Sequence, residues 1–186
     1  RTWRVSVAAA DHPGLFAAIA GSLALSGLDI LAADAYAAAP GVALDVFAVR
    51  PDTLATVDES TFAAFERRLA PALSDPAGLA ARIETRRSHY SPGRHPSPGR
   101  HSTPTVSIEH TGAYATALYV TAADRIGLLY DIARAIAEHD LDIRWAKATT
   151  HGHTVRDVFH VVDATGQPVE DVGVLGHLSM RIRELG

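Results

Sequence analysis

The chain has 186 residues, 47% of them hydrophobic, which is enough for one large domain or two small ones with a buried core. Its formal net charge is −4, from 17 Lys and Arg against 21 Asp and Glu, and no basic stripe with interleaved aromatic residues is present. We therefore expect no nucleic-acid partner. Cysteine is absent, which excludes disulfides, thiolate metal sites and cysteine nucleophiles.

Neither a signal peptide nor a long apolar span is found, so we expect a cytoplasmic protein with no membrane partner. The chain starts at Arg1, inside a strand-like run and without an initiator Met, so we expect it to be part of a longer polypeptide.

Apolar periodicity predicts the order strand, helix, strand, strand, helix in the first half of the chain. Alternating apolar residues indicate strands, and apolar residues three and four positions apart indicate amphipathic helices. Gly27 is expected to end the first helix, and an Ala-Pro-Gly turn to join the second and third strands as a hairpin. The predicted elements span residues 2–9, 13–26, from 28, 42–49 and 62–73, with a helical extension over 76–86.

Residues 88–104 differ in composition from the rest of the chain. Ser-Pro-Gly-Arg-His occurs at 91–95 and again at 97–101, which predicts a flexible insert. Val106 and Ile108 then alternate in a short strand that we expect to complete a first β-α-β-β-α-β unit. The first domain is therefore predicted to span residues 1–111 and to contain the insert.

The pattern of the first unit repeats from residue 114 at an offset of 113. Leu15 corresponds to Leu128, and Leu-Asp-Ile at 28–30 corresponds to the same tripeptide at 141–143. Beyond the hairpin turn the offset becomes 112, where Asp-Val-Phe at 45–47 matches 157–159. The second domain is predicted to span 112–186. It ends on a helix and lacks a fourth strand, which leaves an edge for a partner or for the first domain.

The turn between strand and first helix is the motif that the two copies share most clearly. Each turn has an Asp that can cap the free amides of the helix, followed by a glycine, Gly14 or Gly127, that lets a ligand or another backbone approach. A helix N-terminus of this kind attracts a carboxylate. The alternative interpretation is that Asp11 and Asp124 only cap the helices and that both turns are structural.

A repeated unit with Asp-x-x-Gly-Leu-hydrophobic at the first turn and Leu-Asp-Ile in the second strand resembles the ACT domain, an amino-acid-binding regulatory module. The fold class that this implies is α+β, with two ferredoxin-like βαββαβ domains whose antiparallel sheets carry helices on one face. Residues 124–133, 146–150 and 155–166 resemble the C-terminal tail of the bacterial protein-PII uridylyltransferase family. The sequence departs from that family at Ile126, where Pro is usual, and at His12, where Arg is usual.

The family resemblance implies a regulatory rather than a catalytic role for this chain. The family is bifunctional, with a nucleotidyltransferase domain, a hydrolase domain and two ACT domains that sense glutamine. We expect this chain to sense glutamine for catalytic domains of the same polypeptide, and through them to act indirectly on protein PII. No cofactor is expected here, since magnesium belongs to the absent catalytic domains. A homodimer is also compatible with the resemblance.

Two other functions remain open: a stand-alone amino-acid-binding ACT regulator, and a structural dimerisation module with vestigial sites. In ACT pairs the effector generally lies between domains, at the first turn of one and the second strand of the other. The expected ligand-binding residues are therefore Asp11, His12, Gly14, Leu15, Asp29, Ile30, Asp124, Arg125, Gly127, Leu128, Asp142 and Ile143.

Ten histidines raise the question of a metal site, but their spacing gives no rigid set of three or four ligands. We therefore expect no metal and no catalytic residues. The dipeptide at His139 and Asp140 ends a helix and is expected to favour that helix terminus rather than to hydrolyse a substrate. Trp145 is expected to pack between sheet and helices, close enough to the site to report binding.

Overall fold

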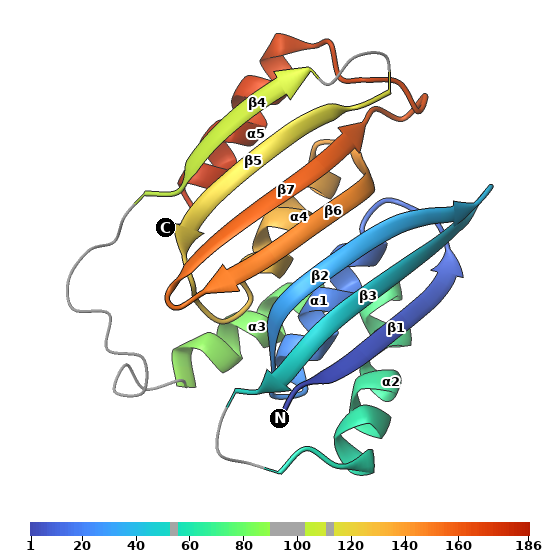
Figure 1. Cartoon of the computed structure of the whole chain (residues 1–186), viewed down its shortest axis with the longest axis vertical. Coiled ribbons are helices and arrows are strands. Elements are labelled where there is room, and N and C mark those ends of the chain that lie inside the picture. The colour runs from blue at the N-terminus through green and yellow to red at the C-terminus, as the bar shows by residue number, and fades with distance from the viewer. Residues whose placement is uncertain (53–55, 90–102, 111–113) are drawn as a thin grey trace.

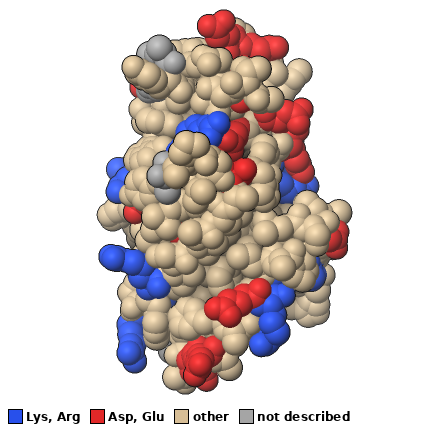
Figure 2. Space-filling model, turned by 90° about the vertical axis from the view of Figure 1, so that its right-hand side faces the viewer, with Lys and Arg blue, Asp and Glu red and all other residues tan. Residues whose placement is uncertain are grey.

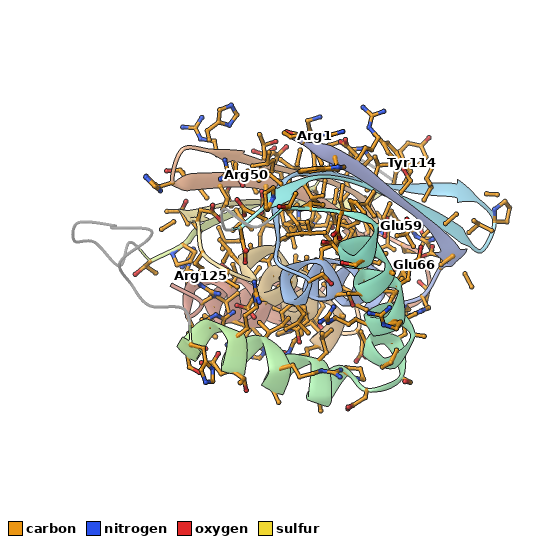
Figure 3. All side chains as sticks on the ribbon, turned by 90° about the horizontal axis from the view of Figure 1, so that it is seen from below. Arg1, Arg50, Glu59, Glu66, Tyr114 and Arg125 are labelled. Carbon is orange, nitrogen blue, oxygen red and sulfur yellow. The ribbon has the colours of Figure 1, made fainter. Side chains whose placement is uncertain are left out.

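The structure is a computed structural model, which describes residues 1–52, 56–89, 103–110 and 114–186. The described strands form one antiparallel sheet in the order β1-β3-β2-β6-β7-β5-β4, and the described helices lie on one side of it (Figures 1 and 3). The strands are β1 (Trp3–Ala10), β2 (Leu28–Ala39), β3 (Val42–Pro51), β4 (Thr105–His110), β5 (Thr116–Ala123), β6 (Asp142–His151) and β7 (Thr154–Val162). The helices are α1 (Leu15–Leu25), α2 (Glu59–Ser74), α3 (Pro76–His89), α4 (Leu128–Glu138) and α5 (Val172–Arg183).

The predicted α+β class with antiparallel strands and helices on one face is confirmed. The two repeats, here called the first unit and the second unit, join edge to edge where β2 pairs with β6. Asp34 lies opposite Lys147 at the middle of this pairing, and these two residues correspond to each other in the sequence repeat. The units are therefore related by an approximate two-fold axis that passes between them.

The placement expected for the short strand at Val106 and Ile108 is wrong. This strand, β4, does not complete the first unit but pairs with β5, where Ile108 lies opposite Leu118. It fills the edge of the second unit that was expected to be empty. The physical reason is the short connection between β4 and β5, since neighbouring antiparallel strands close into a hairpin at little entropic cost. The predicted division of the chain between 111 and 112 stays a prediction.

The buried face of β3 carries a carboxyl group. Ala43, Asp45, Phe47 and Val49 are buried on the side of the helices, whereas Leu44 and its alternate neighbours are half-buried on the open side. Asp45 lies on the face opposite Leu44, and that face is the interior. Both faces of this strand are apolar, so alternation alone does not say which face is covered.

One continuous core serves both units. Phe16 on α1 packs against Phe47 of β3 with ring centroids 5.3 Å apart and against Phe159 of β7 at 6.4 Å in an edge-to-face arrangement. Phe47 and Phe159 are fully buried and correspond to each other in the repeat. A side chain of the first unit therefore lies in the core of the second, which ties the two units together.

The crossing of α1 with α3 and α4 leaves no room for a side chain at Gly21. A Cβ there would lie 2.9 Å from the Tyr130 ring, 3.0 Å from Ile83 and 3.1 Å from Leu79. We expect Gly21→Ala to lower the free energy of unfolding by about 1–3 kcal/mol through overpacking. The control is Gly176→Ala in α5, where a Cβ meets nothing within 4 Å.

The control variant is expected to gain up to about 1 kcal/mol, because alanine favours a helix over glycine. Urea unfolding of both variants measures the difference. Equal stability changes of the two variants would contradict close packing at Gly21.

Candidate functional site

Each of the two turns that the repeats share has a glycine in the left-handed backbone conformation. Gly14 and Gly127 are the N-cap residues of α1 and α4, with φ of 88° and 72°, and neither helix has a side-chain cap. Asp11 and Asp124 are therefore not the N-cap residues. The helices begin later than the sequence suggested, so that each Asp lies three positions before the N-cap residue.

Two of the cavities between the units are each formed by the first turn of one unit and the start of the second strand of the other. Cavity A, of about 60 Å³, is lined by the turn 124–128 and by residues 28–30. Cavity B, of about 20 Å³, is lined by the turn at 11–15 and by residues 141–143. The approximate two-fold axis exchanges them, since each lining segment of one corresponds to a segment of the other.

Every predicted ligand-binding residue lines one of the two cavities. Cavity A contains Asp29, Ile30, Asp124, Arg125, Gly127 and Leu128, and cavity B contains Asp11, His12, Gly14, Leu15, Asp142 and Ile143. The structure thus brings together residues that are more than a hundred positions apart in the sequence. That a ligand binds them stays a prediction.

Sequence reasoning missed the buried acidic residue of each cavity, and also Asp52 in cavity A. Asp157 lines cavity A and Asp45 lines cavity B, with exposed fractions of only 3% and 2%. The signal was available, because both residues open the repeated Asp-Val-Phe motif. An Asp on the interior face of a strand in both copies is unusual, since buried carboxylates are rare.

Burial raises the pKa of both carboxyl groups. The pKa of Asp157 rises to about 7 through desolvation and the nearby charge of Asp124, against a hydrogen bond from the Thr149 amide, 3.1 Å away, that lowers it. The pKa of Asp45 also rises to about 7, through desolvation and the charge of Asp11. Each cavity therefore has a buried carboxyl group that a nearby cation would help to ionise.

Ion pairs from two helices hold the turn of cavity A. Arg87 of α3 donates to Asp131 at 2.7 Å and to the carbonyl oxygen of Ile126 at 3.3 Å. Arg125, which projects from the turn (Figure 3), donates to Asp131 at 2.6 Å and to the carbonyl oxygen of Leu185 at 2.7 Å. The turn is thereby fixed both to α3 of the first unit and to the residues after α5.

Two further pairs flank cavity A, and both lie within the first unit. Arg50 donates to Asp29 at 2.9 Å, and Arg86 of α3 pairs with Asp52. Helix α3 therefore contributes an arginine to each side of the cavity. The second unit has no counterpart of α3 among the described residues, so the two cavities differ in their surroundings.

Gly127 is also where α3 packs against the turn. A Cβ there would lie 3.0 Å from Ile83, whereas at Gly14 the nearest atom, in Ala137, is 4.0 Å away. We expect Gly14→Ala to cost about 1–2 kcal/mol of stability, because alanine resists a positive φ. Gly127→Ala is expected to cost about 1 kcal/mol more through its contact with Ile83.

Thermal unfolding of the two glycine variants side by side measures this difference. Gly14→Ala serves as the control for the backbone, since both residues have φ in the left-handed region. An equal loss of stability would show that α3 does not press on the turn before α4.

Trp145 does not lie where the sequence predicted. Trp145 was expected between sheet and helices, but it lies on the open face, opposite Tyr36, which is 43% exposed. Its ring is 4.9 Å from that of His160, and it lines neither cavity, so it is not placed to report binding. The reason is the register of β6, which turns Ala146 and Ala148 inward instead.

Among the described residues, no group of three or more His, Asp or Glu could hold a metal ion. His95 and His101 of the predicted insert lie outside the described residues. His139 follows α4, with Nδ1 2.8 Å from the carbonyl oxygen of Ala135. On the face shown in Figure 2, acidic and basic side chains of the described residues are interspersed. In the part of the chain that the structure covers, no helix is both long and apolar enough to cross a membrane.

Comparison with known proteins finds similar sequences. Residues 112–184 match the model of the N-terminal ACT domain of the ACR family. The chain is 36% identical over 169 residues to the bifunctional uridylyltransferase/uridylyl-removing enzyme of Gluconobacter oxydans, covering 90% of this chain and 18% of that protein. The same enzyme of Azospirillum brasilense is 33% identical over 181 residues, covering 96% of this chain and 19% of that protein.

A solved structure, of an unknown protein from Galdieria sulphuraria, aligns with 100% of this chain and 94% of that one. It is 15% identical with a TM-score of 0.32, too low to support an argument. Residues 112–184 therefore resemble an ACT domain. The chain as a whole resembles the ACT region of the bifunctional uridylyltransferase/uridylyl-removing enzymes. It spans less than a fifth of the length of the first two relatives and matches none of their catalytic domains.

Proposed function

We propose that this chain is the amino-acid-sensing part of a nucleotidyltransferase that modifies protein PII, and that its effector is glutamine. One observation carries the proposal: each cavity between the units has a buried carboxyl group beside a second Asp at the start of a helix, as at Asp157 and Asp124. The relatives give the setting, because they are bifunctional uridylyltransferase/uridylyl-removing enzymes.

The chemistry of the cavities suits the charged end of an amino acid. Asp124 and Asp157, or Asp11 and Asp45, accept hydrogen bonds from an α-ammonium group, and the helix N-terminus favours an α-carboxylate. Cavity A, of about 60 Å³, has room for roughly four to six water-sized groups, at 10–15 Å³ each. An ammonium group, Cα and a carboxylate together have five non-hydrogen atoms.

Regulation follows from the position of the cavities. Each is formed by segments of both units, so a ligand prefers the arrangement of units that completes its contacts. Only such a preference shifts an equilibrium between two states. In the longer polypeptide that we propose, the catalytic domains respond to this arrangement and require magnesium, while this part binds no cofactor. Dimerisation through this region is compatible with the same role.

Calorimetric titration with glutamine, and with glutamate, serine and phenylalanine for comparison, tests the proposal. We expect saturable binding that is selective for glutamine. Replacing a carboxylate that accepts from the ammonium group, as in Asp157→Asn, is expected to weaken binding at the affected cavity by about 10–100-fold, the equivalent of 1.5–3 kcal/mol. Glu170→Gln, which changes an exposed carboxylate outside both cavities, is the control.

Absence of binding to every amino acid would contradict the proposal and favour a dimerisation module. Selective binding of another amino acid would instead indicate a stand-alone ACT regulator of different specificity.

A further inference from the structure

A further cavity, here called cavity C, lies among the helices, between α1, α3, α4 and the end of α2. Its volume is about 620 Å³, against about 60 Å³ for cavity A. Its wall is mostly apolar and is rich in small side chains; the lining includes Ala17, Ala18, Ala72, Leu73, Leu79 and Ala80. Protein interiors hold few voids larger than a water molecule, whereas small-molecule sites measure about 300–1,000 Å³. Cavity C therefore has the size and the lining of a site for an apolar molecule.

A buried hydroxyl group belongs to the wall of cavity C. Tyr130 of α4 lines the cavity and is only 2% exposed. Among the described residues, its hydroxyl oxygen has no hydrogen-bond partner of normal geometry. Burial raises the pKa of this hydroxyl and the Arg134 guanidinium lowers it, so the two groups lie close together. A buried hydroxyl without a partner costs stability, which favours a ligand that supplies one.

Arg134 lies at the rim of cavity C, one helical turn after Tyr130. It donates from Nε to Glu138 at 2.6 Å, and the two side chains are 35% and 44% exposed. A guanidinium group has five N–H donors, so pairing through Nε leaves its terminal nitrogens for another acceptor, and a carboxylate matches this fork. At a partly exposed rim a carboxylate also keeps part of its hydration while an apolar chain enters the cavity.

We propose that cavity C binds an apolar carboxylic acid of the size of a medium-chain fatty acid. Its carboxylate accepts from Arg134 and from the Tyr130 hydroxyl, and its hydrocarbon chain lies against the alanines and leucines of α1, α2 and α3. The site adjoins the other two cavities, since Tyr130 also lines cavity A and the turn before α1 also lines cavity B. Arg134, Glu138 and Ala80 line neither of them, so this site can be tested apart from the amino-acid sites.

Calorimetric titration of the chain with decanoate tests the proposal, with decanol and decylammonium as probes of the same length. We expect saturable binding of decanoate at one site. Decanol lacks the charged group that Arg134 binds, and it is expected to bind at least about tenfold more weakly. Decylammonium is also expected to bind more weakly than decanoate, because its charge has the same sign as that of Arg134.

Variants of the charged rim locate the carboxylate. Arg134→Gln is expected to weaken decanoate binding by about tenfold, and Tyr130→Phe by about three- to tenfold. Glu138→Gln is expected to strengthen it about two- to threefold, because Glu138 then no longer competes for Arg134. Arg82→Gln, which changes an exposed arginine of α3 outside cavity C, is the control and leaves the affinity unchanged.

Filling the cavity locates the hydrocarbon chain. Ala80→Leu, and Ala77→Leu at the exposed rim, are each expected to weaken decanoate binding by at least about tenfold, because the added atoms occupy its space. Ala81→Leu, on the exposed side of the same helix and outside the cavity, is the matched control. Asp157→Asn, in cavity A, is expected to leave decanoate binding unchanged. Far-ultraviolet circular dichroism confirms that each variant is folded before it is titrated.

Four outcomes would overturn the inference. Decanoate that does not bind, or binds no more tightly than decanol, would show that cavity C is not a carboxylate site. Binding that is unchanged in folded Ala80→Leu and Ala77→Leu would place the ligand elsewhere. Tighter binding of decylammonium, lost in Glu138→Gln, would assign the cavity to a cation. A dimer that Ala80→Leu dissociates, as measured by sedimentation, would make a second copy of the chain the occupant. Selective glutamine binding in any of these cases would leave the proposed function intact, since the two sites are titrated with different ligands.

Discussion

Stability is expected to fall as the pH rises from about 4 to about 7, because two buried carboxyl groups must then ionise. The pKa of Asp45 and that of Asp157 are each raised from 3.8 to about 7 in the folded protein. Between these values the folded state holds more protons than the unfolded state, so stability decreases with pH and levels off above about 7. A shift of about three units corresponds to about 4 kcal/mol for each group, at 1.36 kcal/mol per unit.

Other carboxyl groups act in the opposite direction at lower pH. Hydrogen bonds from Ser60 and Thr61 lower the pKa of Asp58, and those from Thr165 and Gln167 lower the pKa of Asp163. Stability from these groups is lost below about pH 4, as they become protonated. Maximum stability is therefore expected in mildly acidic solution rather than at neutral pH.

Urea unfolding of the ligand-free protein from pH 4 to pH 8 measures this dependence. Asp45→Asn and Asp157→Asn are each expected to be more stable than the wild type at pH 8. Each variant is also expected to show a smaller fall of stability between pH 4 and pH 8 than the wild type. Glu66→Gln, on the exposed surface of α2 (Figure 3), is the control and keeps the full decline. Stability that is constant from pH 4 to pH 8 would contradict the presence of these buried carboxyl groups.

Phe16→Ala is expected to cost about 3–5 kcal/mol of stability, the usual loss for a buried phenylalanine. Phe16 is 5% exposed and contacts Phe47 of its own unit and Phe159 of the other, so its removal opens a cavity where the two cores meet. Phe16→Leu is the matched control, because the corresponding residue of the second unit is Leu129. It is expected to cost less, since leucine fills most of the same space.

Calorimetric unfolding tests the shared core at the same time. Because buried residues of both units form one cluster, we expect a single cooperative transition in the wild type. Two transitions would show that the units unfold separately. If Phe16→Ala then lowered the stability of the first unit alone, the role of Phe16 across the boundary would be contradicted.

Local pattern was sufficient to predict most elements of the fold. The spacing of Leu15, Ile19 and Leu23 predicted α1, and the same spacing after Leu128 predicted α4. Helix α1 is buried on all sides from Leu15 to Ala24, which the one-sided pattern did not indicate. What sequence could not give was the partner of β4. Its alternating Val106 and Ile108 fit the edge of either unit, and only the length of the connections decides between them.

The candidate site was predictable in position but not in composition. The resemblance to paired ACT domains pointed to the first turn and to the Leu-Asp-Ile strand, and these segments line the two cavities. Asp45 was missed because both faces of β3 are apolar, so alternation did not show which face is buried. Asp157 could have been found, because Val155 and Phe159 share its face whereas Arg156 and His160 lie on the other face of β7. The link between Arg144 and Asp11 was also invisible, since it joins residues 133 positions apart.

The pairing of β4 with β5 has a consequence for how this chain can be divided. A cut at the repeat boundary, between residues 111 and 112, would strip the second unit of its outermost strand and expose the edge of β5. A cut between His89 and Thr105 would instead place β1, β2 and β3 on one fragment and β4, β5, β6 and β7 on the other. Among the described strands, the pairing of β2 with β6 is then the one that is divided between the fragments. Two fragments made in this way are the natural candidates for reassembly by complementation.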